Sequence, residues 1–545
     1  MTAPGSTPSS SNNATQLDAV IVGAGFAGLY MLHKLREQGL TAKIFEAGSG
    51  PGGTWFWNRY PGARVDIESM QYSYQFSEEL QQEWQWSERY APQAELLDYI
   101  NHVVERFDLA KDIQFNTRLE SAIFDEGSKR WQATTSNGEH ISARYCIMAT
   151  GCLSAANTPN IAGIDSFTGP VYHTGEWPHE AVDFSGKRVG IIGTGSSAIQ
   201  AIPIIAEQAE HLTVFQRTPN FSVPAHNKAL DPDYVTDIKQ NYASLRERGK
   251  QGFTGFDTQS NEKAATEMSP EEIKAELNKR WEMGGLNFYG GFADFMINKE
   301  TNDLIADFVR EKIAQKVKNP KTAALLSPKT VFACKRLCAD TGYFETYNRD
   351  NVTLVDIATT PIDSITETGL RMGQGDQAQQ HDFDVLVFAT GFDAMTGSLN
   401  KIDIRGIGGQ SLKEKWSAGP RTYLGLCSAG FPNLFTISGP GSPSVFTNMV
   451  TSIEQHVEYI GDIITYMDNN HFTTISANND AEDQWVNHVN EVANATLLNS
   501  CSSWYLGANI PGKERVFMPY IGGFPPYVEK CNEVAAKGYE GFTLS

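Results

Sequence analysis

The chain has 545 residues, of which 41% are hydrophobic and 20% are charged. This length corresponds to about three to five domain-sized units, which excludes a single small binding module. The net charge of −20 repels nucleic-acid phosphates and anionic membrane surfaces. The sequence contains no apolar run near the ~18 residues of a membrane span. We therefore expect a soluble, cytoplasmic and monomeric protein, with neither nucleic acid nor a membrane as its partner.

The cysteines and the N-terminus agree with a cytoplasmic location. An odd number of cysteines, 7 in all, without the spacing of a disulfide framework is typical of free intracellular thiols. Cys334 and Cys338 are four positions apart, but no further Cys or His is close enough in sequence to complete a zinc site, so we expect no metal. Residues 1–16 are rich in Ser, Thr and Asn and lack the regions of a signal peptide, which predicts a disordered tail.

A first nucleotide-binding unit is predicted where the folded chain begins. The apolar strand 19–22 is followed at once by a G-x-G-x-x-G turn, a helix over 29–38 and a second strand that ends at Glu46. The glycines permit a tight bend, close approach of a pyrophosphate and close helix packing, and the acid fits a ribose hydroxyl. The three glycines of this turn are Gly23, Gly25 and Gly28.

A second unit begins at the strand 188–192 and continues through a glycine turn and a helix to about Gln208. The turn contains Gly193 and Gly195, and Ala198 replaces the last glycine, which the looser form of the fingerprint accepts. After the strand 212–215 this unit carries Arg217 in place of an acid. An arginine there can pair with a 2′-phosphate that would repel a carboxylate. The first unit therefore suits FAD and the second suits NADPH.

The remaining segments predict an α/β fold with two Rossmann-like dinucleotide-binding domains. Residues 231–328 have a charged helical pattern, within which a capping box at Ser269 predicts the start of a helix. We interpret these residues as a helical insertion in the NADP domain. Each of the two units ends with the tripeptide Ala-Thr-Gly, at 149–151 in the first and at 389–391 in the second. The predicted domains are 17–151 with 391–545 for FAD, and 152–230 with 329–390 for NADP.

Disulfide reductases also combine two such units, but here Gly52-Gly53-Thr54 is followed by aromatic residues instead of a redox cysteine pair. The segment from Gly52 through Trp55 and Tyr60-Pro61-Gly62 to Asp66 resembles one fingerprint of the type I Baeyer–Villiger monooxygenases. A second segment resembles their other fingerprint, through Phe167, Gly169, His173, Trp177 and Pro178. The resemblance extends over the chain from about residue 17.

The resemblance implies an FAD- and NADPH-dependent oxidoreductase that uses dioxygen to convert ketones to esters or lactones through a flavin peroxide. Related flavin monooxygenases that oxidise sulfur or nitrogen usually lack the Trp-Pro ending, so Trp177-Pro178 disfavours that alternative. A non-catalytic redox sensor with two dinucleotide sites is a second alternative.

The resemblance also assigns roles to individual residues. Two adjacent cations are most often a solvated pair, but the family places Lys335 at the NADP phosphate and Arg336 at the flavin, where a fixed guanidinium stabilises developing negative charge. Asp66 is implied as the carboxylate that orients Arg336, and its position also fits a helix cap. The resemblance places Ala27, Thr54, Trp55, Trp57, Tyr72 and Met449 around FAD, and Thr194, Gly195, Ser196, Ser197, Gln200, Thr218 and Trp504 around NADP.

The roles of three further residues, His173, Trp177 and Phe446, are less directly indicated by the sequence. Without the family, His173 and Trp177 are more often hinge or core residues than catalysts. We expect them to tie the linker between the domains, and direct proton transfer by His173 is the weaker alternative. Phe446 lies in a loop that resembles the family's substrate-pocket loop, where its bulk would narrow the cavity.

Overall fold

The computed structural model describes residues 14–375 and 378–545. Its first sheet has the strand order β17-β4-β5-β6-β1-β2-β3, with β18 paired to β6. Strand β1 runs parallel to both β2 and β6, as expected of a dinucleotide-binding sheet. The strands of this sheet are β1 (Thr15–Val22), β2 (Ala42–Phe45), β3 (Ile113–Gln114), β4 (Leu119–Asp125), β5 (Arg130–Thr135), β6 (His140–Met148), β17 (Asp403–Arg405) and β18 (Leu434–Thr436).

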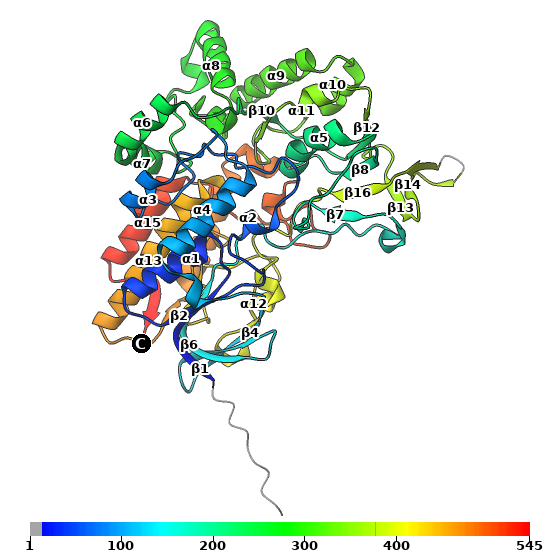
Figure 1. Cartoon of the computed structure of the whole chain (residues 1–545). Coiled ribbons are helices and arrows are strands. Elements are labelled where there is room, and N and C mark those ends of the chain that lie inside the picture. Colours follow the sequence, from blue (N-terminus) through cyan, green and yellow to red (C-terminus); the bar gives the residue numbers. More distant parts are fainter. Residues whose placement is uncertain (1–13, 376–377) are drawn as a thin grey trace, which may run out of the picture.

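The second sheet has the order β12-β9-β8-β16-β7, and every pair in it is parallel. Its strands are β7 (Val171–His173), β8 (Arg188–Ile192), β9 (His211–Gln216), β12 (Val352–Asp356) and β16 (Val385–Phe388). A three-stranded antiparallel sheet projects beside it (Figure 1), formed by β13 (Ile362–Thr366), β14 (Gly369–Met372) and β15 (Gln379–Asp382). The α/β fold class with two Rossmann-like sheets is confirmed.

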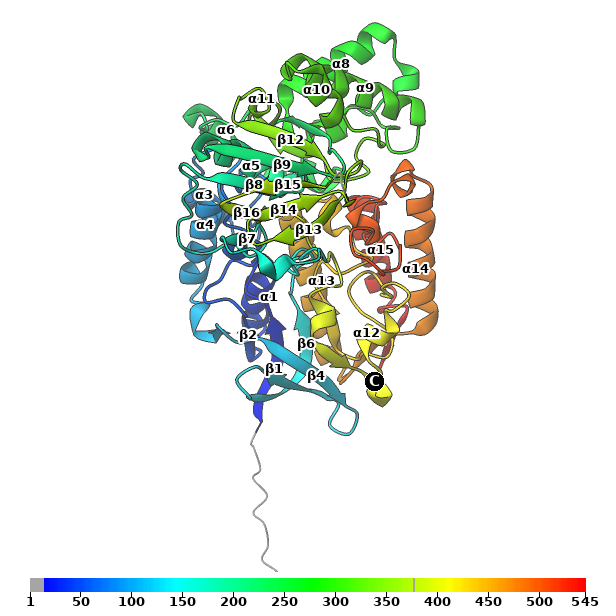
Figure 2. The same cartoon turned by 90° about the vertical axis from the view of Figure 1, so that its right-hand side faces the viewer.

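Helices cover both sheets, and Figure 2 shows the second sheet above the first unit, with the C-terminal helices along one side. Helix α1 packs against α13. The helices of the two units are α1 (Phe26–Glu37), α2 (Thr54–Trp57), α3 (Glu78–Glu83), α4 (Gln93–Arg106), α5 (Ser196–Gln208), α11 (Tyr343–Thr346), α12 (Leu412–Lys415), α13 (Met449–Asn469), α14 (Asn479–Asn494) and α15 (Phe524–Ala536). Short strands complete them: β10 (Ser222–Pro224) with β11 (Cys338–Asp340), and β19 (Ile475–Ala477) with β20 (Phe542–Leu544).

The regular structure of the predicted insertion is helical. The structure describes all of residues 231–328, and the regular elements there are α6 (Pro232–Gln240), α7 (Tyr242–Gln251), α8 (Pro270–Met283), α9 (Lys299–Lys316), α10 (Pro320–Leu326) and two short 3₁₀ turns. Ser269 and Glu272 form the predicted capping box at the start of α8. Ile305, Val309 and Ile313 on α9 are buried at helical spacing, which attaches the insertion to the core.

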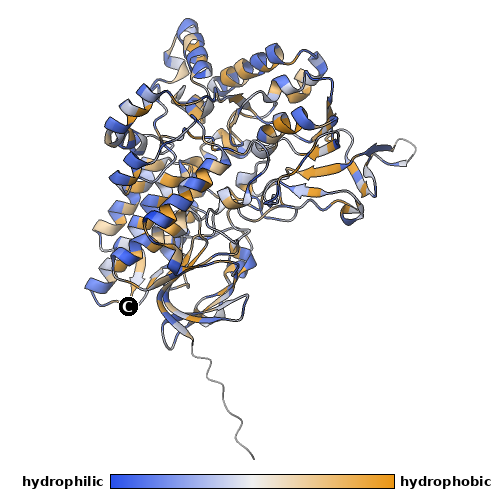
Figure 3. Cartoon of the chain, viewed as in Figure 1, coloured by the Kyte–Doolittle hydropathy of each residue, from blue (hydrophilic) through white to orange (hydrophobic). Residues whose placement is uncertain are grey.

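The apolar pattern of the chain follows its burial. Figure 3 shows hydrophobic residues along the inner strands and on the inward faces of the helices. Among the described residues, no helix combines the length and the apolar character that crossing a membrane requires.

Two predicted boundaries differ from the structure. Helix α1 begins at Phe26, three residues before the predicted Leu29, because the last glycine of the turn already has helical geometry. Strand β1 begins at Thr15, so the predicted tail extended two residues too far, since Thr15 and Gln16 pair with β6. Residues 1–13 of that tail are outside the described residues.

Candidate active site

The first glycine turn is shaped by close backbone approach. Gly23 has a φ of +104°, and a Cβ at this position would lie 2.6 Å from the carbonyl oxygen of Ala149. Within the described part of the chain, no side chain caps the N-terminus of α1, where Gly25 is the N-cap residue. The amides of the first helical turn are thus available to an anionic ligand. This arrangement fits a dinucleotide pyrophosphate.

Glu46 is buried at the end of β2 and supports this turn directly. Its Oε2 accepts a hydrogen bond of 2.7 Å from the Ala24 amide, and its Oε1 accepts one of 2.6 Å from the Gly48 amide. Each carboxylate oxygen can accept a further bond. The acid that the sequence places at a ribose therefore also fixes the backbone of the glycine turn.

The second glycine turn leaves open space in front of a helix. A Cβ built on Gly195 meets no heavy atom of residues 14–375 or 378–545 within 4 Å. Gly195 is the N-cap residue of α5, and among these residues no side chain caps this N-terminus either. In the first turn Ser196 is exposed and Ser197 is partly exposed. Open space and free amides together fit a second dinucleotide phosphate.

Two cations converge beside this space. Arg217 is exposed directly after β9, and Lys335 is half-buried. Burial lowers the pKa of Lys335, and the positive charge of Arg217 lowers it further. The Thr194 hydroxyl donates to the carbonyl of Thr218 at 3.1 Å, which fixes the chain next to Arg217. Two like charges held near each other form an attractive site for a phosphate.

Arg336 and Asp66 form a bidentate ion pair. The Arg336 Nε donates to Asp66 Oδ2 at 2.9 Å, and Nη2 donates to Oδ1 at 3.0 Å. The Arg336 Nη1 donates to the Val445 carbonyl at 2.5 Å. Burial alone would lower the pKa of Arg336, but the Asp66 carboxylate raises it well above its ordinary value. The guanidinium is therefore permanently charged and fixed in orientation.

Gln200 connects the two units. Its Oε1 accepts a bond of 2.9 Å from the Tyr60 hydroxyl, and its Nε2 donates to the Arg64 carbonyl at 3.1 Å. Gly62 has a φ of +80°, and a Cβ there would overlap the Gln200 carbonyl oxygen. The Tyr-Pro-Gly segment of the first unit thus packs directly on α5 of the second.

The linker fingerprint also joins distant segments. His173 Nδ1 accepts a bond of 2.9 Å from the Gly175 amide, and Nε2 lies 3.2 Å from the Thr390 hydroxyl. Burial lowers the pKa of His173, which favours the neutral ring. The Trp177 amide donates to the carbonyl of Trp57 at 3.3 Å. Phe167, at the start of this fingerprint, is buried.

The other residues predicted to surround FAD lie on helices α1, α2 and α13 or pack beside them. Thr54, Trp55 and Trp57 are in α2, Ala27 is in α1, and Met449 begins α13. The Tyr72 ring lies edge-on to Phe26 and to Trp55, with centroid distances of 5.6 and 6.0 Å. Trp504 opens a short 3₁₀ helix, η10 (Trp504–Leu506).

Three residues near Arg336 were not found from the sequence. The Tyr289 hydroxyl accepts from the Leu337 amide at 3.0 Å, and Cys338 Sγ lies 3.1 Å from the Ser196 hydroxyl. The Tyr505 ring lies 4.5 Å from Phe446. Tyr505 directly follows Trp504, and Cys338 is two positions after Arg336, so a signal for these two residues was available in the sequence. Tyr289 comes from the insertion and had no such signal.

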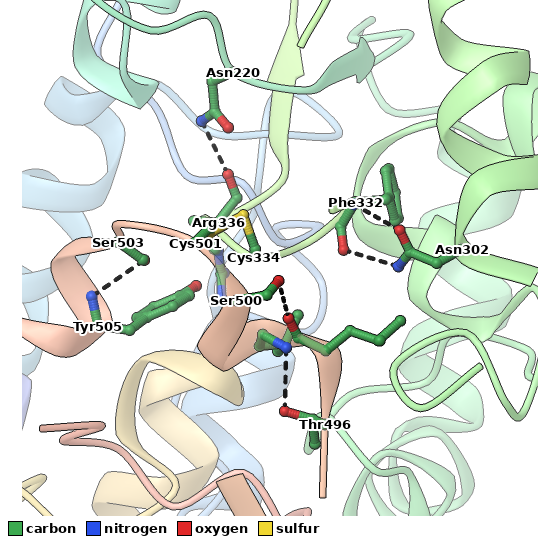
Figure 4. Close-up of a disulfide and its surroundings, with 12 residues drawn as sticks. Asn220, Asn302, Phe332, Cys334, Arg336, Thr496, Ser500, Cys501, Ser503 and Tyr505 are labelled. Atoms are coloured by element: carbon green, nitrogen blue, oxygen red, sulfur yellow. Dashed lines mark hydrogen bonds between the residues drawn. A yellow bond between two sulfur atoms is a disulfide. The ribbon is translucent and has the colours of Figure 1, made fainter. Parts of the chain in front are cut away.

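The prediction that all cysteines are free thiols is wrong. Cys334 and Cys501 form a disulfide with a Cα–Cα distance of 6.4 Å (Figure 4). The two residues are 167 positions apart, so no spacing pattern could have paired them. The other five cysteines in the described part of the chain are free and buried.

Comparisons with known proteins identify relatives over nearly the whole chain. A family model described as pyridine nucleotide-disulphide oxidoreductase matches residues 20–279. A Baeyer-Villiger monooxygenase of Pseudooceanicola batsensis is 43% identical over 96% of this chain and 95% of its own. A phenazine N-monooxygenase of Lysobacter antibioticus is 42% identical over 98% of both chains. The solved structure of an oxidized steroid monooxygenase bound to NADP has 51% identity and a TM-score of 0.92, over 97% of this chain and 99% of that one.

Proposed function

Because the chain belongs to the type I Baeyer–Villiger monooxygenases, an FAD- and NADPH-dependent family of oxidoreductases, we propose that it converts ketones to esters or lactones with NADPH and dioxygen. The observation that carries the proposal is the fixed Arg336–Asp66 pair. A non-catalytic sensor would have no use for a permanently charged guanidinium held between two nucleotide units.

We assign FAD to the unit of residues 17–151 and 391–545, with the pyrophosphate at the N-terminus of α1 and the ribose at Glu46. The aromatic residues of α2, Tyr72 and Met449 would surround the rest of this cofactor. NADP is assigned to residues 152–230 and 329–390. The open space at Gly195 and the free amides of α5 support this assignment.

FAD, when bound, supplies the redox chemistry, by accepting hydride from NADPH and activating dioxygen. The protein supplies positioning and charge. Arg336 stabilises negative charge that develops on oxygen during transfer to the ketone, and it does so without reorganisation because Asp66 already fixes it. Asp66 does not move a proton in this scheme, since it serves only to orient the guanidinium.

Arg217, Thr218 and Lys335 would select NADPH over NADH. The two cations pair with the 2′-phosphate, and its negative charge relieves their mutual repulsion. Trp504 would cover the dinucleotide from the C-terminal segment. His173 and Trp177 would transmit movement between the units as linker residues, and the lowered pKa of His173 supports a hinge rather than a proton donor.

The substrate would pack against an aromatic surface formed by Phe446, Tyr505 and Phe517. The Phe446 ring lies 4.5 Å from Tyr505 and 5.9 Å from Phe517, measured between centroids. The carbonyl of the neighbouring Val445 accepts a bond from Arg336, which connects this surface to the guanidinium. We propose that Phe446 narrows the cavity and disfavours large polycyclic ketones.

The experiment that tests the reaction is a ketone panel with the FAD-loaded enzyme, NADPH and ¹⁸O-labelled dioxygen. Mass spectrometry should find one labelled oxygen atom in the ester or lactone. NADPH consumption should rise when ketone is added, which would exclude a sensor. A flavin-loaded protein that makes no ester from any linear, cyclic or aromatic ketone would overturn the proposal.

Oxygenation of nitrogen is a second candidate, because the phenazine N-monooxygenase is as similar to this chain as the Baeyer-Villiger relative. The same assay therefore includes an aromatic nitrogen heterocycle and a thioether. Formation of an N-oxide or sulfoxide without any ester would favour this function. The Trp177-Pro178 ending of the linker fingerprint supports the ketone reaction.

We further propose that the enzyme acts as a monomer in the cytoplasm. Dependence on NADPH supports a compartment in which this coenzyme is regenerated.

A further inference from the structure

The disulfide joins two segments that carry predicted site residues. Cys334 directly precedes Lys335 and Arg336, and Cys501 is three residues before Trp504. Figure 4 shows the disulfide beside Arg336, with Ser503 and Tyr505 on the segment that follows Cys501. A single covalent bond therefore connects the catalytic-arginine segment to the C-terminal segment that would cover NADP.

The Cys334 end of this bond is fixed. Asn302 of α9 donates to the Phe332 carbonyl at 3.1 Å and accepts from the Phe332 amide at 2.8 Å. The side-chain amide of Asn302 is itself held in place, because its Nδ2 also donates to the Phe295 carbonyl at 3.0 Å. Cys334 is only 1% exposed. We therefore expect this segment to keep its place when the disulfide is reduced.

The Cys501 end is held mainly by local contacts. The Ser500 hydroxyl donates to the Leu497 carbonyl at 2.6 Å, and the Tyr505 amide donates to the Ser503 hydroxyl at 3.3 Å. Cys501 is partly exposed, and Ser500 and Ser502 on either side of it are exposed. Longer-range bonds hold the flanks of this segment, where the Leu497 amide donates to the Met296 carbonyl at 2.8 Å and the Met518 amide donates to the Tyr505 carbonyl at 2.9 Å. Between these two points, the disulfide attaches the segment to the chain next to Arg336.

We propose that Cys334–Cys501 is a reversible redox lock that holds the Trp504 segment over the cofactor site and that opens when the disulfide is reduced. The proposal rests on the proposed function for the roles of Trp504 and Arg336. In the locked state the segment stays next to Arg336, and water is kept away from the reacting atoms. In the open state NADP binds less tightly, and reduced cofactor loses its electrons to dioxygen without oxygenating the ketone.

The redox step is a two-electron exchange with a dithiol. A thiolate of the reductant attacks Sγ of the partly exposed Cys501, the S–S bond breaks, and Cys334 leaves as a thiolate that takes a proton from water. The second thiol then closes the reductant's own disulfide and releases Cys501 as a thiol. In the reverse direction, one hydrogen peroxide oxidises the two thiols to the disulfide and yields two waters. Turnover that is uncoupled from the ketone releases hydrogen peroxide, so it would close the lock again.

The test compares the oxidised holoenzyme with the same enzyme reduced by excess dithiothreitol. Mass spectrometry after alkylation counts the thiols. Because loop closure affects kcat and KM together, we expect the reduced enzyme to give an ester yield per NADPH that is lower by about twofold or more, and a higher KM for NADPH. Peroxide treatment should restore both values.

Variants separate the lock from a general effect of reductant. Cys501→Ser should behave like the reduced wild type and should not respond to dithiothreitol, and the double variant Cys334→Ser/Cys501→Ser should match it. Cys531→Ala removes a buried free thiol in α15 and should keep the full wild-type response. A lower unfolding temperature with unchanged ester yield and unchanged KM would show a merely structural disulfide and would overturn the proposal.

A readout that needs no ketone separates this proposal from the proposed function. Hydrogen–deuterium exchange should become faster in residues 497–508 on reduction and should stay unchanged in residues 330–340. The dissociation constant of NADP⁺ should rise in parallel. If no ester forms from any ketone but both changes appear, the lock stands and the proposed function fails. If exchange in residues 497–508 does not change, the lock is wrong.

Discussion

Arg336 and Asp66 are 270 positions apart in the chain, yet they share two parallel hydrogen bonds of 2.9 and 3.0 Å. Asp66 lies between α2 and α3 in the first unit, whereas Arg336 lies just before β11. The pair therefore forms only when both units are folded and in contact. Because a bidentate carboxylate fixes the plane of a guanidinium, the charge also has a defined direction.

Replacement of Arg336 should slow oxygen transfer strongly while the flavin remains bound. Loss of one fixed charge-stabilising group in such a site costs about 3 to 4 kcal/mol, so Arg336→Ala should form ester roughly a hundred- to a thousandfold more slowly. NADPH oxidation should continue at a reduced rate with release of hydrogen peroxide. Stopped-flow reduction and product analysis measure the two steps. A variant that makes ester at the wild-type rate would show that another residue has this role.

The effect of Asp66 should depend on Arg336. Asp66→Asn keeps the size of the side chain but removes the charge that orients the guanidinium, so ester formation should fall by less than in Arg336→Ala. In a double-mutant cycle, the double variant should be no slower than Arg336→Ala alone, because Asp66 acts through the arginine. Additive losses in the cycle would mean that Asp66 has an independent role.

Arg217 should discriminate between coenzymes. A charge-assisted bond to phosphate contributes about 1.5 to 3 kcal/mol, so Arg217→Ala should weaken NADPH by roughly ten- to a hundredfold and leave NADH almost unchanged. The KM values for both coenzymes measure this difference. Arg188→Ala is a suitable control, since Arg188 is an exposed arginine of the same unit that pairs with Asp384. Equal losses with NADPH and NADH would assign Arg217 a structural role.

Gly62 should be required for contact between the units. Any other residue there must adopt a positive φ and also push its Cβ into the backbone of Gln200. Gly39→Ala is the matched control, because Gly39 has a similar φ of +76° and no heavy atom of the described residues lies within 4 Å of its added Cβ. The control should cost about 1 kcal/mol, and Gly62→Ala should lower the unfolding temperature further and raise the KM for NADPH. Identical behaviour of the two variants would refute the contact argument.

Glu454 should make stability depend on pH. It is buried on α13 and accepts bonds of 2.6 and 3.0 Å from the amides of Gln75 and Phe76. Burial raises the pKa of Glu454 from 4.5 to about 7. A raised pKa in the folded state means that the protonated carboxyl stabilises the fold below pH 4.5, and that this contribution is lost as the pH rises to about 7.

Glu454→Gln keeps the acceptor oxygen and removes the titration. The free energy of unfolding of the wild type should therefore fall relative to that of the variant between pH 4.5 and pH 8, by at most about 1.4 kcal/mol per pH unit. The unfolding temperatures of the two proteins, measured over this range, should diverge in the same direction. Parallel curves for the two proteins over this range would show that Glu454 does not titrate there.

The two glycine turns could be predicted from the sequence because each is local. A strand, a turn and a helix follow one another within a short stretch, and Glu46 and Arg217 come at the ends of the next strands. The pairing of Asp66 with Arg336 could not be derived from spacing, and it was expected only because the fingerprints resemble a family. The Cys334–Cys501 disulfide has no counterpart in any local pattern, and the prediction of free thiols failed there.

Gln200 shows a further limit of local reasoning. Its place near the N-terminus of a nucleotide-binding helix predicts a cofactor contact. Instead, its side-chain oxygen accepts from Tyr60 and its side-chain nitrogen donates to Arg64, and both partners belong to the other unit. Such a contact depends on how two folded units pack, and helical periodicity contains no information about it.

Lys335 and Arg336 are consecutive residues whose side chains serve different neighbours, since one lies near Arg217 and the other bonds to Asp66. Their Cα atoms are separated by only about 3.8 Å across a rigid peptide unit. A ligand that draws Lys335 toward its phosphate therefore also pulls on the backbone that positions the Arg336 guanidinium. Under the proposed assignment, the choice between NADPH and NADH would affect the rate of oxygen transfer as well as coenzyme affinity. A coenzyme without the 2′-phosphate would bind more weakly and would also leave the Arg336 guanidinium less well oriented.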